Sequence, residues 1–373
     1  MTIAKLERWV FRAPVANQVR NAFGAMSNRP ALFLRITASD GAFGWGEVFC
    51  NFPQVGAEHR ARLLSSIFVP LVVDLPDDDP PAVRVQLEAR TRRMAIQCGE
   101  PGPFAQIIGA IDQALWDLAA RRAGVPLWQL LARPGEGVNR VRVYASGIGP
   151  ERVLEIAQQR WQDGYRAFKL KVGFDPVLDR ANLAALRDAL GPDTPIMIDA
   201  NQAWNPGDAR ARIAALADLR PHWVEEPMAA DEALADWSAL ARDCALPLAA
   251  GENLRGEAAF HAAIETGFLR FVQPDVGKWG GLTGCRAVAR HALAKGIEFC
   301  PHWLAGGIGL AHSMHLRAAM GEGGFVEVDA NPNPLREEVL RLDVVDGWAT
   351  ISGASGLGFE PDLGRLKDFL INI

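Results

Sequence analysis

The feature that most constrains the fold is a repeat in the second part of the chain. From residue 140 onward, short apolar stretches alternate with amphipathic helical segments, and an ionisable side chain closes each stretch at intervals of 23–28 residues. Alternation of this kind predicts βα units and a parallel sheet, and this many units favour a closed (β/α) barrel. The side chains at the predicted strand ends are Lys171, Asp199, Glu225, Glu252, Asp275, His302 and Glu327.

A barrel places the C-terminal ends of its strands around one mouth, so these side chains are expected to share one cavity. One alternative is that they are unrelated surface charges, but their agreement in phase with the repeat argues against it. An open doubly wound sheet is a second alternative. It is disfavoured because no glycine-rich phosphate loop follows any of the predicted strands.

The part before the repeat has a different organisation. Strands are predicted at Ala31–Ala38 and Phe43–Val48, joined by the turn signal Asp40-Gly41, and an amphipathic helix is predicted at Ile107–Ala123. Strands followed by helices indicate an α+β domain. With a linker at residues 134–137, we expect a capping domain at 1–135, the barrel at 136–345, and a C-terminal segment at 346–373 that packs back on the capping domain.

Three carboxylates end consecutive predicted strands: Asp199, Glu225 and Glu252. Neighbouring carboxylates repel one another unless a cation lies between them. Ligation by oxygen alone favours Mg²⁺, with Mn²⁺ as a possible substitute, and the absence of His or Cys from the set disfavours Zn²⁺. The alternative for each carboxylate is a structural salt bridge with an arginine.

Two lysines and a histidine supply candidate acids and bases. Lys169 and Lys171 are two residues apart on one strand and therefore point to the same face. If that face is the barrel interior, burial and mutual repulsion should lower a lysine pKa and create a general base. Asp275 and His302 end adjacent strands and could form a dyad. Glu327 could be a protonated acid that donates a hydrogen bond to developing negative charge. The alternatives are that the two lysines lie on a solvated edge strand and that His302 is a structural histidine.

Taken together, these motifs resemble those of the enolase superfamily, and within it the mandelate racemase subgroup. The resemblance implies a modified (β/α)7β TIM-like barrel with an N-terminal α+β capping domain. It implies that Lys171 and His302 are the catalytic acid/base pair, and that Lys169, Asp275 and Glu327 support them. The motifs are Lys169-Leu-Lys171, Asp199-Ala-Asn201, Val224-Glu225-Glu226-Pro227, Gly251-Glu252-Asn253, Asp275, His302, Glu327 and the stretch Ala110–Leu131.

The implied chemistry is removal of the proton α to a carboxylate, which gives an enediolate. Dehydration of an acid sugar or hydroxy-diacid to a 2-keto acid ranks first, and racemisation or epimerisation of a 2-hydroxy acid second. Asp275 occupies the place where the muconate lactonizing branch has a lysine, which argues against that branch. A non-catalytic barrel that binds a metal or an acid is a further alternative. A metal-dependent hydrolase is disfavoured because no HxH motif ends an early strand.

Substrate specificity is expected to come from two capping-domain loops near residues 16–29 and 49–56. The predicted substrate contacts are Asn201, Asn21, Phe23, Arg29 and Asn51, with Met26, Phe49 and Phe52 as further candidates. The net charge of −5 and the lack of basic clusters disfavour nucleic acid as a partner, and no apolar run is long enough for a membrane span. Five scattered cysteines are typical of a cytoplasmic enzyme. We expect a small-molecule carboxylate as the substrate and a homo-oligomeric assembly.

Overall fold

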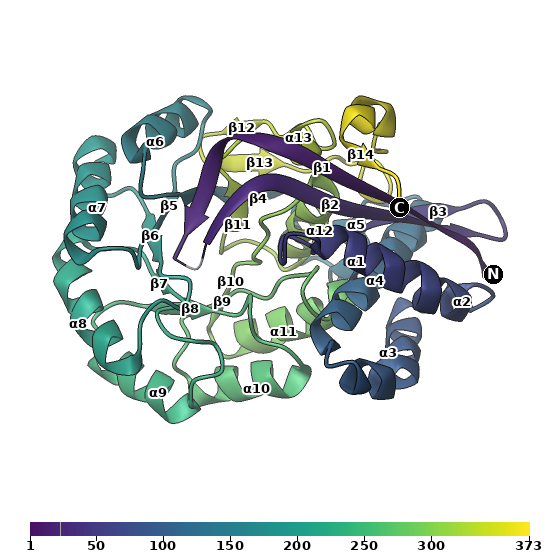
Figure 1. The fold of residues 1–373 in the computed structure, drawn as a ribbon, viewed down its shortest axis with the longest axis horizontal. Coiled ribbons are helices and arrows are strands. Elements are labelled where there is room, and N and C mark those ends of the chain that lie inside the picture. Colours follow the sequence, from purple (N-terminus) through teal and green to yellow (C-terminus); the bar gives the residue numbers. More distant parts are fainter. Residues whose placement is uncertain (23) are drawn as a thin grey trace.

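The computed structural model describes residues 1–22 and 24–373 and has two parts (Figure 1). The first part is an antiparallel sheet packed against helices. Its strands run in the order β14-β1-β2-β3, with bounds β1 (Ile3–Asn21), β2 (Gly24–Ala38), β3 (Phe43–Val48) and β14 (Leu370–Ile371). Its helices are α1 (Gly56–Leu63), the π-helical turn η1 (Leu64–Phe68), α2 (Val69–Val72), α3 (Pro80–Gln97), α4 (Pro101–Ala123) and α5 (Leu127–Leu131).

The second part is the predicted barrel. In residues 140–329, all of which are described, eight parallel strands alternate with seven helices, which confirms the (β/α)7β architecture. The strands are β4 (Arg140–Ile148), β5 (Phe168–Lys171), β6 (Ile196–Asp199), β7 (Val224–Glu225), β8 (Leu248–Ala250), β9 (Phe271–Val272), β10 (Glu298–Phe299) and β11 (Val326–Asp329). The helices are α6 (Val153–Gln162), α7 (Pro176–Leu190), α8 (Pro206–Leu216), α9 (Leu234–Asp243), α10 (Glu257–Thr266), α11 (Gly281–Ala294) and α12 (Gly307–Ala319).

Local sequence explains where two of these helices begin. The Asp175 side chain accepts hydrogen bonds from the backbone N–H groups of Val177 and Leu178 at the start of α7. Asn205 caps α8 in the same way. In each case a proline follows at the first helical position, where its missing N–H costs nothing. The predicted helix at 107–123 begins earlier, at Pro101, and the predicted strand at 31–38 begins at Gly24.

The floor of the barrel is closed by one layer of apolar side chains from its eight strands. The Tyr144 and Trp223 rings meet edge to face with centroids 5.6 Å apart, and Trp223 lies 4.7 Å from Phe271. Such a layer fills the interior and excludes water. The charged side chains therefore lie above it, at the C-terminal ends of the strands. The layer consists of Tyr144, Ala167, Met197, Trp223, Ala249, Phe271, Cys300 and Phe325.

Two buried carboxylates of the capping domain fix it to the barrel. Glu47, on β3, accepts hydrogen bonds from the backbone N–H groups of Gly306 and Gly309 at the start of α12, at 2.6 and 2.9 Å. Asp112, on α4, accepts from the Thr283 N–H at the start of α11, at 2.9 Å. Helix N-termini attract negative charge, so each carboxylate stabilises the contact. Burial nevertheless raises the pKa of Glu47 to about 8 and that of Asp112 to about 7.

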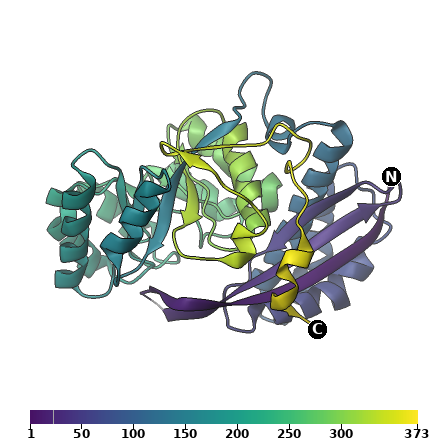
Figure 2. The same ribbon diagram turned by 90° about the horizontal axis from the view of Figure 1, so that it is seen from above.

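The C-terminal segment of the chain returns to the sheet of the capping domain. After β11 come the short helix α13 (Pro334–Glu337) and the hairpin of β12 (Val344–Val345) and β13 (Trp348–Thr350), which pairs with β4. The 3-10 helix η3 (Leu363–Phe369) then leads into β14, which pairs with β1. The β1–β2 hairpin reaches from the capping sheet across to the barrel (Figure 2). Within the described ranges, no helix combines the length and apolarity that crossing a lipid bilayer requires.

Candidate active site

A cavity of about 660 Å³ lies between the capping domain and the C-terminal end of the barrel. This volume is in the range typical of small-molecule sites. The barrel supplies Lys171, Asn201, Glu252 and His302 to its wall. The capping domain supplies residues of the β1–β2 hairpin, the loop after β3, α1 and the start of α4; among them are Arg20, Asn21, Met26, Phe49, Asn51, Phe52, Arg60, Gly102 and Gln106.

The two lysines of β5 are buried together inside the barrel. The Lys171 Nζ lies 2.5 Å from Asp199 Oδ2. The Lys169 Nζ lies 2.5 Å from Glu225 Oε1 and 2.7 Å from Glu327 Oε1. The predicted interior placement is therefore observed, and the solvated edge strand is excluded.

The pKa predicted for these lysines is wrong in this structure. Burial is the largest influence on the pKa of Lys171 and lowers it, but Asp199, Glu225 and Glu327 together raise the pKa above its ordinary value. Burial likewise opposes the charged form of Lys169, while Glu225 and Glu327 hold its pKa well above normal. The physical reason is that neighbouring carboxylates stabilise each ammonium group more than burial and the second ammonium destabilise it.

Asp199 and Glu225 end adjacent strands and are register partners in the sheet. Asp199 Oδ1 accepts the Asn201 N–H at 2.8 Å. Glu225 Oε2 accepts hydrogen bonds from Trp223 Nε1 at 3.0 Å and from Gln273 Nε2 at 2.6 Å. Donors of this kind hold ligand carboxylates in a fixed orientation. Both carboxylates are thus buried, oriented and directed at the same end of the barrel.

Glu252, the third predicted metal ligand, lies two residues after β8 and faces the cavity. Its Oε2 lies 2.5 Å from Lys278 Nζ and 2.9 Å from His302 Nε2. Among the described residues, the only His, Cys, Asp or Glu group whose ligand atoms lie within 4.8 Å of one another is on the outer face, at His261, Glu265 and His291. The three predicted ligands therefore share the mouth, but their oxygens are not drawn together to that distance.

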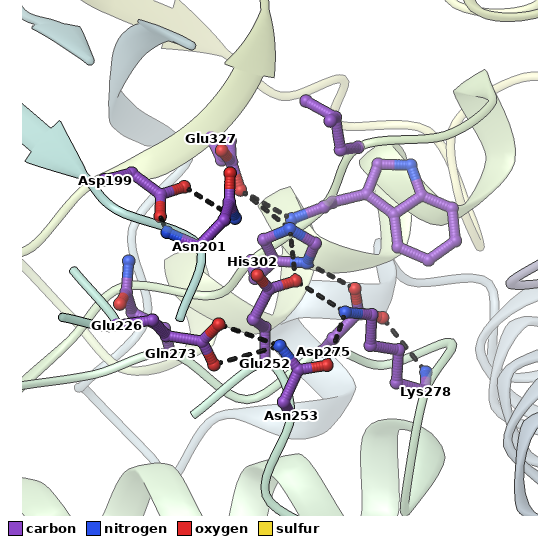
Figure 3. Close-up of polar contacts among 12 residues, drawn as sticks. Asp199, Asn201, Glu226, Glu252, Asn253, Gln273, Asp275, Lys278, His302 and Glu327 are labelled. Atoms are coloured by element: carbon purple, nitrogen blue, oxygen red, sulfur yellow. Dashed lines mark hydrogen bonds and ion pairs between the residues drawn. The ribbon is translucent and has the colours of Figure 1, made fainter. Parts of the chain in front are cut away.

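His302 lies at the centre of the polar contacts (Figure 3). Its Nδ1 lies 2.5 Å from Asp275 Oδ2, so the expected dyad is present in the structure. Burial lowers the pKa of His302, but Glu252, Glu327 and the hydrogen bond that the ring donates to Asp275 raise it to about 10. The imidazole is therefore held in its protonated form, with its Nε2 facing Glu252.

The protonation state predicted for Glu327 is wrong in this structure. Its Oε1 accepts hydrogen bonds from Ser146 Oγ and Lys169 Nζ, and its Oε2 accepts the Trp303 N–H at 3.2 Å. Burial raises the pKa of Glu327, but Lys169 and His302 lower it to about 2. Glu327 is consequently a carboxylate that accepts hydrogen bonds.

The predicted substrate contacts divide into three groups. Asn21, Asn51 and Asn201 line the cavity, as do the further candidates Met26, Phe49 and Phe52. Phe23 lies outside the described residues. The prediction for Arg29 is wrong, because its guanidinium is buried against Asp329 on β11 and does not reach the cavity.

Sequence reasoning did not include among the substrate contacts four cations that line the cavity: Arg20, Arg60, Arg255 and Lys278. Lys278 lies three residues after Asp275, in a turn whose backbone N–H groups donate to that carboxylate. Its position three residues after Asp275 was the one feature of the sequence that could have indicated a place at the cavity. Nothing local marks Arg60 or Arg255, because each reaches the cavity only through the packing of the two domains.

Two family patterns cover most of the chain. The N-terminal domain of the mandelate racemase/muconate lactonizing enzymes matches residues 6–132. The enolase C-terminal domain-like pattern matches residues 152–365. The second match alone covers more than half of the chain.

Similar proteins include a 3,6-anhydro-alpha-L-galactonate cycloisomerase from Streptomyces coelicolor, 32% identical over 98% of both chains. A D-galactonate dehydratase from Variovorax paradoxus is 32% identical over 75% of this chain and 73% of its own.

Solved structures show the same likeness across the whole chain. A mandelate racemase/muconate lactonizing enzyme from Bordetella bronchiseptica is 46% identical, with a TM-score of 0.91 over 99% of both chains. A Streptomyces coelicolor racemase with bound magnesium is 29% identical, with a TM-score of 0.89 over 99% of this chain and 100% of its own. Fold, strand-end side chains and sequence thus agree, and the chain belongs to the mandelate racemase/muconate lactonizing enzyme family of the enolase superfamily.

Proposed function

We propose that the protein is a magnesium-dependent acid-sugar dehydratase. It removes the proton α to the substrate carboxylate and expels the β-hydroxyl, which gives a 2-keto acid. The observation that supports this most directly is that Lys171 and His302 line one cavity. They come from β5 and from the loop after β10, which β11 and β4 separate around the barrel. A substrate between them therefore meets an acid/base group on either side.

The donor set fits a magnesium ion. Asp199, Glu225 and Glu252 come from or directly after three consecutive strands, and all three are buried carboxylates. Ligation by all three would bring their oxygens closer together than they lie in this structure. When bound, Mg²⁺ would neutralise negative charge on the substrate carboxylate. It would also neutralise the carboxylates that now raise the lysine pKa values, which favours a neutral Lys171.

The chain's own groups then account for the proton transfers. The Lys171 Nζ takes the α-proton, and the electron pair released moves towards the carboxylate. The bond between the β carbon and its hydroxyl breaks, and protonated His302 gives its proton to the departing oxygen, so that water leaves. The resulting enol becomes the 2-keto acid by losing the proton of its hydroxyl group and taking a proton at the β carbon. Asp275 holds the imidazole at Nδ1 and keeps Nε2 directed into the cavity.

Incubation with Mg²⁺ and a panel of acid sugars in D₂O tests this proposal. We expect at least one acid to form a 2-keto acid, with deuterium entering at the β carbon, as followed by NMR and by trapping of the ketone. Exchange of the α-proton without a new product would instead indicate racemisation. A complete lack of exchange across a broad panel of hexonates, hexarates and pentonates would contradict the proposal and favour a non-catalytic barrel.

Cycloisomerisation is a second candidate. The relative that spans 98% of both chains is named a cycloisomerase of an anhydro sugar acid. The same elimination gives cycloisomerisation when the departing oxygen is part of a ring. The ring then opens, and no water is lost. Mass spectrometry separates the two reactions: a product of unchanged mass indicates ring opening, and a product lighter by one water indicates dehydration.

His302→Asn is expected to block product formation by about 10²–10⁴-fold, because asparagine cannot deliver the proton that the departing oxygen needs. The rate of α-proton transfer to Lys171 should fall less than the rate of product formation, because Lys171 is unchanged. Both rates are measured in one NMR time course. His261→Asn, at an exposed histidine on α10, is the matched control. Equal rates for His302→Asn and the control would remove His302 from the mechanism.

A further inference from the structure

Arg60 is a buried guanidinium without an acidic partner. It lies on α1, is 4% exposed and lines the cavity. Its Nε donates to Gln106 Oε1 at 2.6 Å, and its Nη1 donates to the Gly56 carbonyl at 3.0 Å. In the part of the chain that the structure describes, no carboxylate forms an ion pair with it. The nearby Glu100 is paired with His59, at 3.0 Å.

Two neutral acceptors orient this group without neutralising it. A buried charge is costly unless an opposite charge lies near it. Burial accordingly lowers the pKa of Arg60. Its hydrogen bonds use Nε and Nη1, and they leave Nη2 without a hydrogen bond to any described residue. The group is thus held in place at the cavity wall without an ion-pair partner in the described part of the chain.

Arg255 approaches the same end of the cavity from the barrel side. It lies on the loop after β8 and makes no ion pair or hydrogen bond within the described ranges. Its Nη1 lies against Gly102 in the first turn of α4, where a Cβ would come within 3.1 Å of it. One turn further along α4 is Gln106, the partner of Arg60. The first turns of α4 therefore lie beside both guanidinium groups.

The remaining cations of the cavity have acidic partners. Lys171 contacts Asp199, Lys278 contacts Glu252, and Arg20 contacts Glu151. Among the described residues, the cavity's guanidinium groups without an acidic partner are therefore those of Arg60 and Arg255, and both lie beside the first turns of α4. An anionic group of a bound molecule would complement them.

We infer that the substrate has two anionic ends, with the reacting carboxylate at the barrel mouth and a second carboxylate against Arg60 and Arg255. This inference rests on the proposed function and narrows the substrate class to aldarates, the sugar acids with a carboxylate at both ends. A guanidinium presents its N–H groups in a planar fork that matches a carboxylate. A terminal CH₂OH group, as in an aldonate, would leave both positive charges without a partner.

Matched pairs of acids test the inference. Galactarate and galactonate differ only at the terminal carbon, and each further hexarate in the panel is compared with the hexonate of the same configuration. We expect the wild-type protein with Mg²⁺ to prefer the diacid. Arg60→Met and Arg255→Met should lower kcat/KM for the diacid about 10–100-fold, mainly through KM, because a charged hydrogen bond is lost. For the monoacid, the change should stay below about threefold.

Three further variants and a binding measurement complete the test. Arg62→Met, at an exposed arginine on the same helix, should leave both acids unaffected, and Arg60→Lys should restore part of the diacid preference. Because Arg255 is exposed and makes no ion pair or hydrogen bond within the described ranges, its variant should unfold at the wild-type temperature. Calorimetric titration of the same acids into the Mg²⁺-loaded protein gives the preference independently of turnover.

The outcomes separate the two proposals. Equal affinity for diacid and monoacid, or an equal loss for both in Arg60→Met, would overturn the inference and leave the proposed function standing. Tighter binding of a terminal phosphate ester than of the diacid would overturn the carboxylate assignment. If the protein binds the diacid more tightly than the monoacid but exchanges no α-proton, the inference is supported and only the proposed function is contradicted.

Discussion

Lys171→Ala is expected to abolish exchange of the substrate α-proton while the protein keeps its fold. The amine is the only side chain of β5 that both lines the cavity and can take a proton from the substrate in the proposed mechanism. Loss of a positioned general base lowers a rate by about 10²–10⁴-fold. The loss should appear in kcat, because binding of the reacting carboxylate uses other groups. Exchange in D₂O, followed by NMR, measures it directly.

The control for this variant is Lys295→Ala, which removes an exposed lysine that contacts Glu265 on the outer face of the barrel. Both variants should give wild-type circular dichroism spectra. The Lys171 variant should show a modest change in unfolding temperature, because Asp199 loses a buried partner while it keeps its hydrogen bonds from Asn201. Wild-type exchange in Lys171→Ala would remove this residue from the mechanism.

Chelation of the metal is the second large effect. Dialysis against EDTA should lower activity by about 10³-fold or more, because the charge that develops on the substrate carboxylate would lose its main stabilisation. Added Mg²⁺ should restore the rate, and Mn²⁺ should restore part of it, since both ions accept oxygen ligands. Initial rates against metal concentration give the affinity. Full activity in excess chelator would contradict the metal assignment.

A ligand variant shows whether the predicted carboxylates hold the ion. Glu252→Gln should raise the Mg²⁺ concentration for half-maximal activity at least about tenfold, because one negative oxygen ligand is lost. Glu257→Gln, at an exposed acid a few residues further on, should leave that concentration unchanged. If both variants respond to Mg²⁺ as the wild-type protein does, Glu252 is not a ligand.

The barrel and the placement of the strand-end side chains could be predicted because they depend on local, periodic signals. The 23–28-residue interval reflects one strand and one helix, and parallel strands bring whatever ends them to one mouth. Helix starts such as Asp175 follow from a side chain that caps its own backbone. These patterns depend only on nearby residues, so the fold, the two buried lysines and the Asp275–His302 contact could be predicted from the chain.

The charge states of the buried side chains could not be predicted in this way. Two lysines two residues apart predict a lowered pKa when only burial and their mutual repulsion are counted. Asp199, Glu225 and Glu327 come from other strands and raise the pKa instead. The charge state of Glu327 also depends on groups from other strands, because Lys169 and His302 lower its pKa and favour the ionised carboxylate. Electrostatic balance in a low-dielectric interior depends on every group within a few ångströms, and the chain order does not give those distances.

The sequence by itself determined the barrel, its capping domain and the ring of ionisable groups, because residues a few positions apart specify strands, helices and their ends. Only the tertiary structure decided which arginine faces the cavity. Arg29 is neutralised by Asp329, 300 residues away, whereas Arg60 donates hydrogen bonds to Gln106 and a backbone carbonyl and forms no ion pair with the described part of the chain. The physical reason is that a guanidinium binds a ligand only where folding leaves its charge without an internal partner.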